Sequence, residues 1–337
     1  MTEPSPAPLV PHGRLLVVHA HPDDETLATG GLLATWAAAG EEVTLVTCTR
    51  GERGEVIGDE LAHLEGDGPA LAAHREQELG AALLALGVRD HAYLDELPAP
   101  GLTDDSVAAR YEDSGMSWVG GTGAGLSGQA GAAADVPARA LVSGSLEHQA
   151  TRLAHLVRDR RPDVVVTYEP GGGYGHPDHV RAHGITMRAV ELAAHAPGGL
   201  PPHRVGDVWW VVIPSDTLRR ARGQLVDAVR AGGLEIGSAT LADPDGLLPA
   251  VAAGDRQAVA VLDTRPVLDR VESALRAHAT QVHLVSRLAD GPADDPSDLV
   301  GTYALSNDIL VPWLAAEYYA PADTTGGPSQ PAPSVER

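Results

Sequence analysis

The sequence predicts an α/β protein with a Rossmann-like, mostly parallel sheet, helices on both faces and a smaller C-terminal α/β subdomain. Three short apolar runs, Leu15–Ala20, Val43–Thr47 and Asp163–Tyr168, have the length and composition of buried strands. They alternate with longer helical segments, and this strand–helix–strand order is typical of βαβ units. Such units place their strands in parallel and cover both faces of the sheet.

Glycines mark the ends of the first two expected helices. Leu27–Ala39 stops before Gly40 and Leu71–Leu86 stops before Gly87, and glycine is favoured just past a helix end. The remaining expected elements are a strand at His91–Leu94, helices at Ala140–Asp159 and His179–Ala196, strands at Val208–Ile213 and Val259–Leu262, and a helix at Thr264–Thr280. The last three belong to the smaller subdomain.

The chain is expected to consist of two folded parts between two disordered tails. Residues 1–13 and 320–337 are rich in Pro, Gly, Ser and Thr, which is typical of chain ends without fixed structure. Residues 14–200 form the Rossmann-like metal-binding domain, and residues 201–319 form the smaller subdomain. The low-complexity segment Gly120–Ala134 is expected to be a mobile loop.

The composition excludes several classes of function. The 337 residues include 24 Lys and Arg against 46 Asp and Glu, a formal net charge of −22. Nucleic acids and anionic membranes repel such a chain, so neither is expected as a partner. The sequence has no apolar run long enough to span a membrane and no export signal at its start, so we expect a cytoplasmic protein. Because Cys48 is the single cysteine, a bound metal needs His, Asp or Glu ligands.

Two histidine-containing motifs follow two of the predicted strands. The first is His19–Glu25 (HAHPDDE) and the second is Gly171–His179 (GGGYGHPDH). One such segment alone is more often a hydrogen-bonded turn, but ligand sites in open parallel sheets form at the carboxyl ends of strands, where both motifs lie. Two imidazoles and one carboxylate suit Zn²⁺ or Fe²⁺ and leave positions open for water and substrate. The pair therefore favours a catalytic metal site.

These motifs resemble those of the PIG-L/LmbE-like zinc-dependent N-deacetylases. The resemblance is carried by His21-Pro22-Asp23-Asp24-Glu25 and His176-Pro177-Asp178-His179. It implies that His21, Asp24 and His179 hold one Zn²⁺ per subunit, with Fe²⁺ as the alternative, and that Asp23 is the general base. Five further segments are similar to the subgroup that acts in mycothiol biosynthesis: Val46–Thr49, Gly54–Asp59, Tyr111–Met116, Val166–His179 and Ala277–Val282.

The chemistry of amide hydrolysis gives roles to the other residues of the motifs. A bound cation polarises the carbonyl group and lowers the pKa of a water molecule, and Asp23 accepts the proton of that water and later delivers it to the leaving amine. We expect His176, as an imidazolium, to stabilise the oxyanion, and Asp178 to hold the ring of His176. Tyr174 on the glycine-rich loop is expected to add a hydroxyl donor.

Five further residues are expected to contact the substrate. The resemblance makes Glu55, Arg75 and Asp113 partners of sugar or inositol hydroxyl groups, and exposed surface charge is the alternative interpretation for all three. Ser114 and Met116 are expected to line the sugar pocket.

The resulting hypothesis is an enzyme that removes acetate from N-acetylglucosaminyl-inositol, a small-molecule substrate. The nearest alternative is the mycothiol S-conjugate amidase, which shares the metal chemistry but cleaves a cysteinyl amide. An alternative of another class is a non-catalytic protein that binds a metal or sugar, although binding alone needs neither a base nor an oxyanion donor. A dinucleotide-dependent dehydrogenase is disfavoured because no G-x-G-x-x-G motif follows the first strand.

Overall fold

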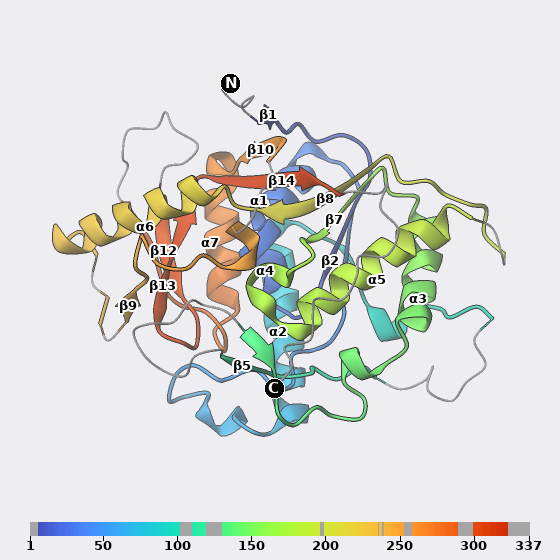
Figure 1. Cartoon of the computed structure of the whole chain (residues 1–337), viewed down its shortest axis with the longest axis horizontal. Helices are drawn as coiled ribbons and strands as arrows, with labels where there is room; N and C mark the ends of the chain where they lie inside the picture. The colour runs from blue at the N-terminus through green and yellow to red at the C-terminus, as the bar shows by residue number, and fades with distance from the viewer. Residues whose placement is uncertain are drawn as a thin grey trace, which may run out of the picture.

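A large, mostly parallel β-sheet organises the protein (Figure 1). The computed structural model describes residues 6–101, 110–118, 130–195, 199–234, 236–237, 239–252, 258–288 and 299–322. Within these residues the sheet has eight strands in the order β1-β10-β14-β8-β7-β2-β3-β4. Their bounds are Ala7–Pro8 (β1), Leu15–His19 (β2), Val43–Thr47 (β3), Asp90–Tyr93 (β4), Val164–Tyr168 (β7), Asp207–Val212 (β8), Ala260–Asp263 (β10) and Ala316–Pro321 (β14). Strand β14 is antiparallel to both neighbours, and the other neighbouring pairs are parallel.

Helices cover both faces of this sheet because its central strands are buried on both sides. Leu15 and Val17 of β2 pack with α1, α2 and α7, whereas Leu16 and Val18 pack with α3 and α5. The helix bounds are Asp24–Ala39 (α1), Gly68–Leu86 (α2), Leu146–Arg160 (α3), Gly172–Gly175 (α4), Pro177–Ala193 (α5), Ser215–Arg230 (α6) and Leu268–Ala277 (α7). The predicted α/β class, with a mostly parallel sheet between two helical layers, is confirmed.

The chain forms one large sheet across the expected boundary at residue 200. Strand β8 lies parallel to β7, with Asp207 opposite Val164, and β10 and β14 extend the same sheet beyond β8. The expected division into residues 14–200 and 201–319 therefore does not separate two sheets. The C-terminal part adds a smaller four-stranded sheet with the order β11-β12-β13-β9, formed by His283–Arg287, Leu299–Ala304, Ile309–Leu314 and Thr240–Leu241.

Parts of the expected tails and loop belong to strands. Ala7–Pro8 pairs with β10 at the edge of the sheet, and β14 continues to Pro321 between β10 and β8, because backbone pairing orders segments whose composition favours disorder. Residues 1–5 and 323–337 lie outside the described residues. In the segment expected as a mobile loop, residues 120–129 are also outside them, whereas Ala130–Ala132 (β6) pairs with Met116–Trp118 (β5).

Two expected helices begin later than their apolar patterns suggest. Helix α3 starts at Leu146 rather than at residue 140, because the Ser145 hydroxyl accepts the amide of His148 and caps the helix there. A short 3₁₀ turn precedes it. Helix α7 starts at Leu268, after a 3₁₀ turn at Arg265–Val267 that contains a proline.

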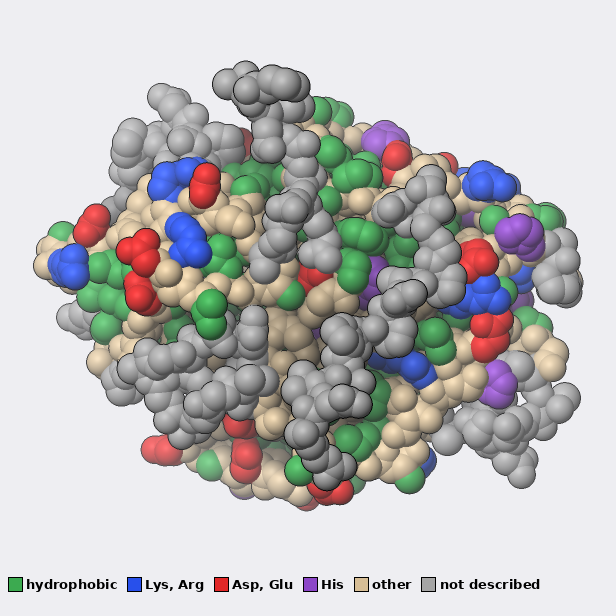
Figure 2. Space-filling model, in the orientation of Figure 1, with side chains coloured by type: hydrophobic (Ala, Val, Ile, Leu, Met, Phe, Trp, Pro, Cys, Tyr) green, Lys and Arg blue, Asp and Glu red, His purple; other side chains and the backbone are tan. Residues whose placement is uncertain are grey.

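Charged side chains on the surface are interspersed. Figure 2 shows arginine and acidic side chains side by side on the visible face, and exposed pairs such as Arg188 with Glu147 and Arg276 with Glu272 occur on the helices. Such pairs contribute little to stability because water and salt screen them. No helix within the described ranges has the length and apolar character needed to cross a bilayer.

A carboxylate from the last strand stabilises a break inside α1. The backbone of Thr29 leaves the helical conformation, with φ at −142°. The freed amides of Gly31 and Leu32 donate hydrogen bonds to the Glu317 carboxylate at 2.7 and 2.9 Å, and the Tyr319 hydroxyl donates to it at 2.6 Å. Burial raises the pKa of Glu317 to about 7. The break therefore depends on a carboxyl group that exchanges its proton near neutral pH.

We predict that Glu317 makes the protein less stable as the pH rises from about 4.5 to 7. Its pKa is about 7 in the folded protein and 4.5 for an ordinary glutamate, so in this interval the unfolded chain has released a proton that the folded chain still holds. Stability then falls by at most about 1.4 kcal/mol per pH unit. The measurement compares the free energy of unfolding of the wild type with that of Glu317→Gln across this pH range.

The control for this comparison is Glu42→Gln, which removes an exposed carboxylate in the connection between α1 and β3. A difference between wild type and Glu317→Gln that stays constant from pH 4.5 to 7 would contradict the prediction.

Candidate metal centre and active site

The two motifs meet because the strands that precede them are neighbours. Strands β2 and β7 pair in parallel, so their carboxyl ends lie at the same edge of the sheet. His21 follows β2 directly, and His179 lies in the first turn of α5, after the short helix α4. The imidazole rings of His21 and His179 are 5.3 Å apart between centroids. This distance allows both rings to contact one ion, although 158 positions separate them in the sequence.

The Asp24 carboxylate lies between the two histidines. Its Oδ1 is 3.2 Å from His179 Nε2, and its Oδ2 is 3.5 Å from His21 Nδ1. The carboxylate is fixed because Oδ2 also accepts the backbone amide of His21 at 2.9 Å. Two ring nitrogens therefore face the two oxygens of one carboxylate.

The other nitrogen of each ring is bound to an acceptor. His179 Nδ1 donates to the carbonyl oxygen of Gly172 at 3.2 Å, and His21 Nε2 donates to the Asp178 carboxylate at 3.2 Å. Since these oxygens can only accept, each contact places the ring proton away from Asp24. In the neutral rings, the nitrogens that face Asp24 carry the lone pairs, which is the arrangement that hydrogen-bonded partners give to metal-binding histidines.

These residues fit a divalent cation. His179 Nε2 is buried and has no hydrogen-bond partner among the described residues, which is costly for a polar atom unless a ligand binds there. Donor atoms of His21, His176 and His179 also lie within 4.8 Å of one another, as do those of His21, Asp113 and Asp178. The site thus offers several nitrogen and oxygen donors of the kind that Zn²⁺ and Fe²⁺ accept.

The carboxylates around His21 change its proton affinity. Burial alone would lower the pKa of His21, but Asp113, Asp178 and Asp24 together raise it well above the ordinary value. The pKa of Asp24 lies well below its usual range: burial opposes this shift, and His179 and His21 cause it. The centre is therefore built to hold positive charge.

The structure corrects two expected properties of His176 and Asp178. The Asp178 carboxylate does not hold the His176 ring; it accepts hydrogen bonds from His21 and from the amide and hydroxyl of Ser114. His176 Nδ1 instead accepts the backbone amide of Asp178 at 3.1 Å. Burial, together with the neighbouring His21 and His179, lowers the pKa of His176 to about 2. His176 is thus a neutral imidazole with its proton on Nε2, and not an imidazolium.

Asp23 adopts a backbone conformation that is rare outside glycine. Its φ is 116°, in a region that costs an ordinary residue of the order of 1–3 kcal/mol. Two contacts hold it: the Asp23 amide donates to Glu25 Oε2 at 2.9 Å, and Arg75 lies 3.4 Å from its carboxylate. Burial raises the pKa of Asp23 to about 7, while Arg75 opposes the shift. Asp23 is the neighbour of Asp24 in the sequence, but its carboxylate does not lie between His21 and His179 as that of Asp24 does.

Arg75 is buried inside the site and not on the surface. Its guanidinium group donates to the carbonyl oxygens of Gly51 and Pro22, in addition to its ion pair with Asp23. Gly51 makes this close approach possible, because a Cβ atom there would lie 2.0 Å from Arg75 Nη1. Arg75 therefore joins the loops after β2 and β3 and positions the Asp23 backbone.

The other expected substrate residues lie at different depths. Asp113 and Ser114 are buried, and Asp113 Oδ1 lies 3.6 Å from His21 Nε2. Met116 is half-buried in β5. Glu55 is exposed on the loop after β3, and its carbonyl oxygen accepts the side-chain amide of Gln281 at 2.9 Å. Four of the five expected residues, counting Arg75, are thus at least half-buried, and Glu55 lies on an exposed loop.

Tyr174 and a residue that sequence reasoning missed pack on His179. The Tyr174 ring meets the His179 ring edge-on at 5.0 Å, and the Tyr168 ring stacks on it at 4.4 Å. The Tyr168 hydroxyl also accepts the amide of Ala20 at 2.9 Å, which fixes the start of the first motif. Its position at the end of β7, directly before the second motif, is the signal that could have identified it.

A second contact that the sequence did not reveal reaches the site from α7. His278 at the end of α7 donates to Glu25 Oε1 at 2.7 Å, and both side chains are fully buried. Burial opposes protonation of His278, but Glu25 raises its pKa. Since Glu25 also accepts the Asp23 amide, this pair connects the C-terminal part of the chain to Asp23.

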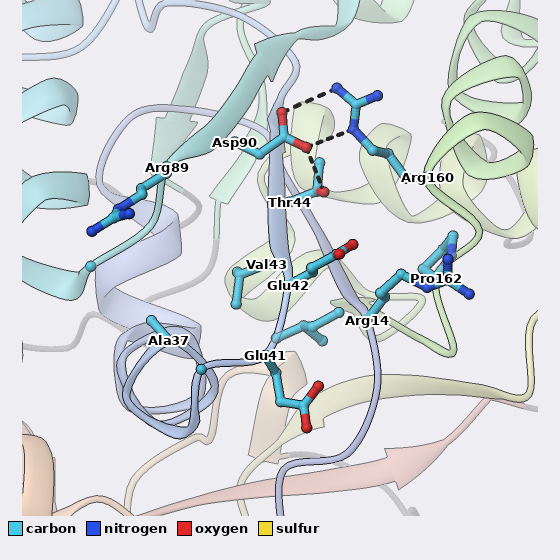
Figure 3. A pocket seen from close by; sticks show the side chains of 13 residues that line it. Arg14, Ala37, Glu41, Glu42, Val43, Thr44, Arg89, Asp90, Arg160 and Pro162 are labelled. Atoms are coloured by element: carbon cyan, nitrogen blue, oxygen red, sulfur yellow. Dashed lines mark hydrogen bonds and ion pairs between the residues drawn. The ribbon is translucent and has the colours of Figure 1, made fainter.

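The opposite edge of the sheet has different chemistry. A cavity of about 580 Å³ lies there, at the amino ends of β2 and β3. Figure 3 shows Arg160 bound to Asp90, with Thr44 donating to the same carboxylate. Arg14, also at this cavity, pairs with Asp163. The described lining of this cavity contains carboxylates but no histidine, unlike the site at the carboxyl edge.

We predict that Gly172→Ala weakens metal binding about 10- to 100-fold, the usual effect of disturbing a partner that orients a metal ligand. Gly172 has φ at 67°, and a Cβ atom there would lie 2.7 Å from the Val180 amide nitrogen and 2.9 Å from His179 Cβ. The substitution therefore displaces the carbonyl that holds His179 Nδ1. The Zn²⁺ dissociation constant, measured by competition with a chromophoric chelator, tests this.

Gly184→Ala on α5 is the matched control, because its added Cβ meets only Leu146 Cδ1 within 4 Å, at 3.7 Å. Equal zinc affinity of Gly172→Ala and Gly184→Ala would show that the loop carbonyl does not orient the ligand.

Comparison with known proteins identifies the family. The family model described as PIG-L, GlcNAc-PI de-N-acetylase, matches residues 16–190, which include both motifs. A protein of Kineococcus radiotolerans is 43% identical, over 94% of this chain and 79% of its own length. Proteins of Rhodococcus opacus (42%, covering 91% and 90%) and Streptomyces griseus (40%, covering 92% and 83%) are also similar. All three relatives are named 1D-myo-inositol 2-acetamido-2-deoxy-alpha-D-glucopyranoside deacetylase. This chain belongs to the PIG-L deacetylase family.

Proposed function

We propose that this protein is a metal-dependent hydrolase that removes acetate from N-acetylglucosaminyl-inositol in mycothiol biosynthesis. The observation that carries the proposal is the arrangement around Asp24: two buried ring nitrogens face its carboxylate, and a second carboxylate, Asp23, lies beside it. The names of the relatives at 40–43% identity support the substrate.

His21, Asp24 and His179 would hold the cation. The nitrogens of His21 and His179 that face Asp24 have their other ring nitrogens bound to acceptors, so both are prepared as ligands. We propose Zn²⁺ as the ion, with Fe²⁺ as the alternative, since both accept two imidazoles and a carboxylate. When bound, such a cation supplies a Lewis acid that polarises the amide carbonyl and lowers the pKa of water.

Asp23 acts as the general base. It takes the proton of the attacking water and returns it to the amine as the carbon–nitrogen bond breaks, which yields acetate and a free amino group. Its place is fixed by Arg75 and by the Glu25 carboxylate that accepts its amide. Catalysis requires the Asp23 carboxylate within reach of the water. We infer that the strained backbone at Asp23 holds the carboxylate there.

His176 and Tyr174 stabilise the negative charge that develops on the carbonyl oxygen. His176 donates from Nε2, because its Nδ1 accepts the Asp178 amide, and a neutral imidazole can act as such a donor. Tyr174 brings its ring against His179 and adds a hydroxyl donor. The Asp178 side chain acts through His21 and Ser114, so it positions a metal ligand.

The sugar and inositol rings bind on the side of Asp113. Asp113 lies beside His21 there, Ser114 bonds to Asp178, the half-buried Met116 lines the pocket, and Glu55 contacts the substrate from the rim. The loop that carries Glu55 is tied to the end of α7 through Gln281. Arg75 is close to Asp23 and contacts the hydroxyl groups of the sugar from within the site.

We predict that Asp23→Asn lowers kcat by about 10²–10⁴-fold, the usual contribution of a general base. Asn keeps the size of the side chain but cannot accept the proton, and Asp23 is not among the proposed ligands, so zinc content should stay at one ion per chain. Kinetics of acetate release and metal analysis of the same sample give both quantities.

Two controls accompany this measurement: Asp216→Asn removes an exposed carboxylate on α6, and Asp24→Asn should lose the metal. Full activity of Asp23→Asn with metal bound would favour the non-catalytic alternative.

We also predict that removing the metal abolishes acetate release from N-acetylglucosaminyl-inositol and that added Zn²⁺ restores it, because the carbonyl then regains its Lewis acid. Fe²⁺, added without oxygen to a second portion, tests the alternative ion. Parallel assays with a bimane conjugate of mycothiol distinguish the two amide substrates. Rapid cleavage of the conjugate alone would replace the deacetylase proposal with the S-conjugate amidase.

A further inference from the structure

An apolar cavity opens directly beside the metal donors. It has a volume of about 320 Å³, and Asp24, His179 and Tyr174 form part of its wall. The rest of the wall comes from α1, β8, α7 and the smaller sheet, and its main apolar members are Leu27, Ile213, Leu275, Tyr303, Leu305 and Trp313. In Figure 1, α7 and strands β12 and β13 of the smaller sheet lie together on one side of α1.

The described lining of the cavity is separate from the residues proposed to bind the sugar. The described residues that line it include none of Glu55, Arg75, Asp113, Ser114 and Met116. Asp24 and His179 thus stand between a polar side and an apolar side.

The polar and apolar sides of the site match the two parts of the amide substrate, its amine and its acyl group. The amine half of the substrate is a polyhydroxylated sugar, which suits the carboxylates and the guanidinium group. The acyl half is apolar and must extend the other way from the carbonyl carbon. An acetyl group adds only one methyl there, whereas the cavity has about ten times the ~30 Å³ that one water molecule occupies in the liquid.

We propose that this cavity is an acyl-binding site and that the enzyme also hydrolyses amino sugars with N-linked alkanoyl chains of about four to eight carbons. The proposal rests on the proposed deacetylase function. The reaction is the same: water adds to the carbonyl carbon, the carbon–nitrogen bond breaks, and an alkanoate and a free amine leave. Burial of each added methylene favours the longer chain until the cavity is filled.

Two measurements on the wild type test the proposal. With metal bound, kcat/KM for N-hexanoylglucosaminyl-inositol should equal or exceed that for the N-acetyl compound. Without metal, calorimetry should show that N-hexanoylglucosamine binds at least about tenfold more tightly than N-acetylglucosamine, with a more negative heat-capacity change, the signature of apolar burial. A 100-fold loss of kcat/KM with no gain in binding, while acetate is still released, would overturn the acyl site.

Two matched leucine-to-tryptophan variants test whether the preference for the hexanoyl substrate arises in the cavity. Leu305→Trp adds bulk inside the cavity, so the ratio of hexanoyl to acetyl kcat/KM should fall at least tenfold. Leu84→Trp, at a side chain on α2 that is 83% exposed, should leave this ratio unchanged. If Leu305→Trp does not fold, the binding measurements on the wild type still decide the question.

Two further outcomes distinguish failure of the proposed deacetylase function from failure of the acyl-site assignment. If neither compound is hydrolysed, the proposed deacetylase function is wrong, and the calorimetry on metal-free protein alone decides whether the cavity binds acyl chains. If hexyl N-acetylglucosaminide binds more tightly than N-acetylglucosamine but N-hexanoylglucosamine does not, the cavity takes a chain from the amine side, and the acyl assignment is overturned.

Discussion

The orientation of two buried imidazoles toward one carboxylate is the constraint on which the site depends. His21 and His179 can act as ligands only if their protons lie on the nitrogens that point away from Asp24. The Asp178 carboxylate and the Gly172 carbonyl impose this arrangement. Both acceptors belong to the second motif, so the sequence that supplies one ligand also orients the other.

This arrangement explains several features that would otherwise reduce stability. Asp23 has a positive φ, and Gly172 and Gly173 also lie in the left-handed region. Buried carboxylates surround His21, and taking charged groups out of water is costly unless they are paired. Hydrogen bonds from backbone amides and ion pairs with histidine or arginine compensate for part of this cost. Strain and buried charge are both concentrated at the carboxyl ends of β2 and β7, where the fold places its chemistry.

Much of this could be predicted from the sequence, and the rest depends on contacts between distant segments. The apolar runs predict β2, β3, β7, β8 and β10 within one or two residues, because these strands are mostly buried. The resemblance carried by the two motifs implies His21, Asp24 and His179 as the metal ligands. The partner of Asp178 could not be predicted, because His21 and Ser114 reach it from 157 and 64 positions away. The same holds for His278, which meets Glu25 from 253 positions away, and for β10 and β14, whose pairing joins the C-terminal part to the large sheet.

The most direct test of the central claim is anomalous diffraction at the zinc edge from crystals of the metal-loaded protein. We predict one zinc peak bound by Nδ1 of His21, Nε2 of His179 and the Asp24 carboxylate, with Asp178 and the Gly172 carbonyl on the opposite ring nitrogens. A peak bound instead by His21, Asp113 and Asp178, or by His176 in place of Asp24, would contradict it.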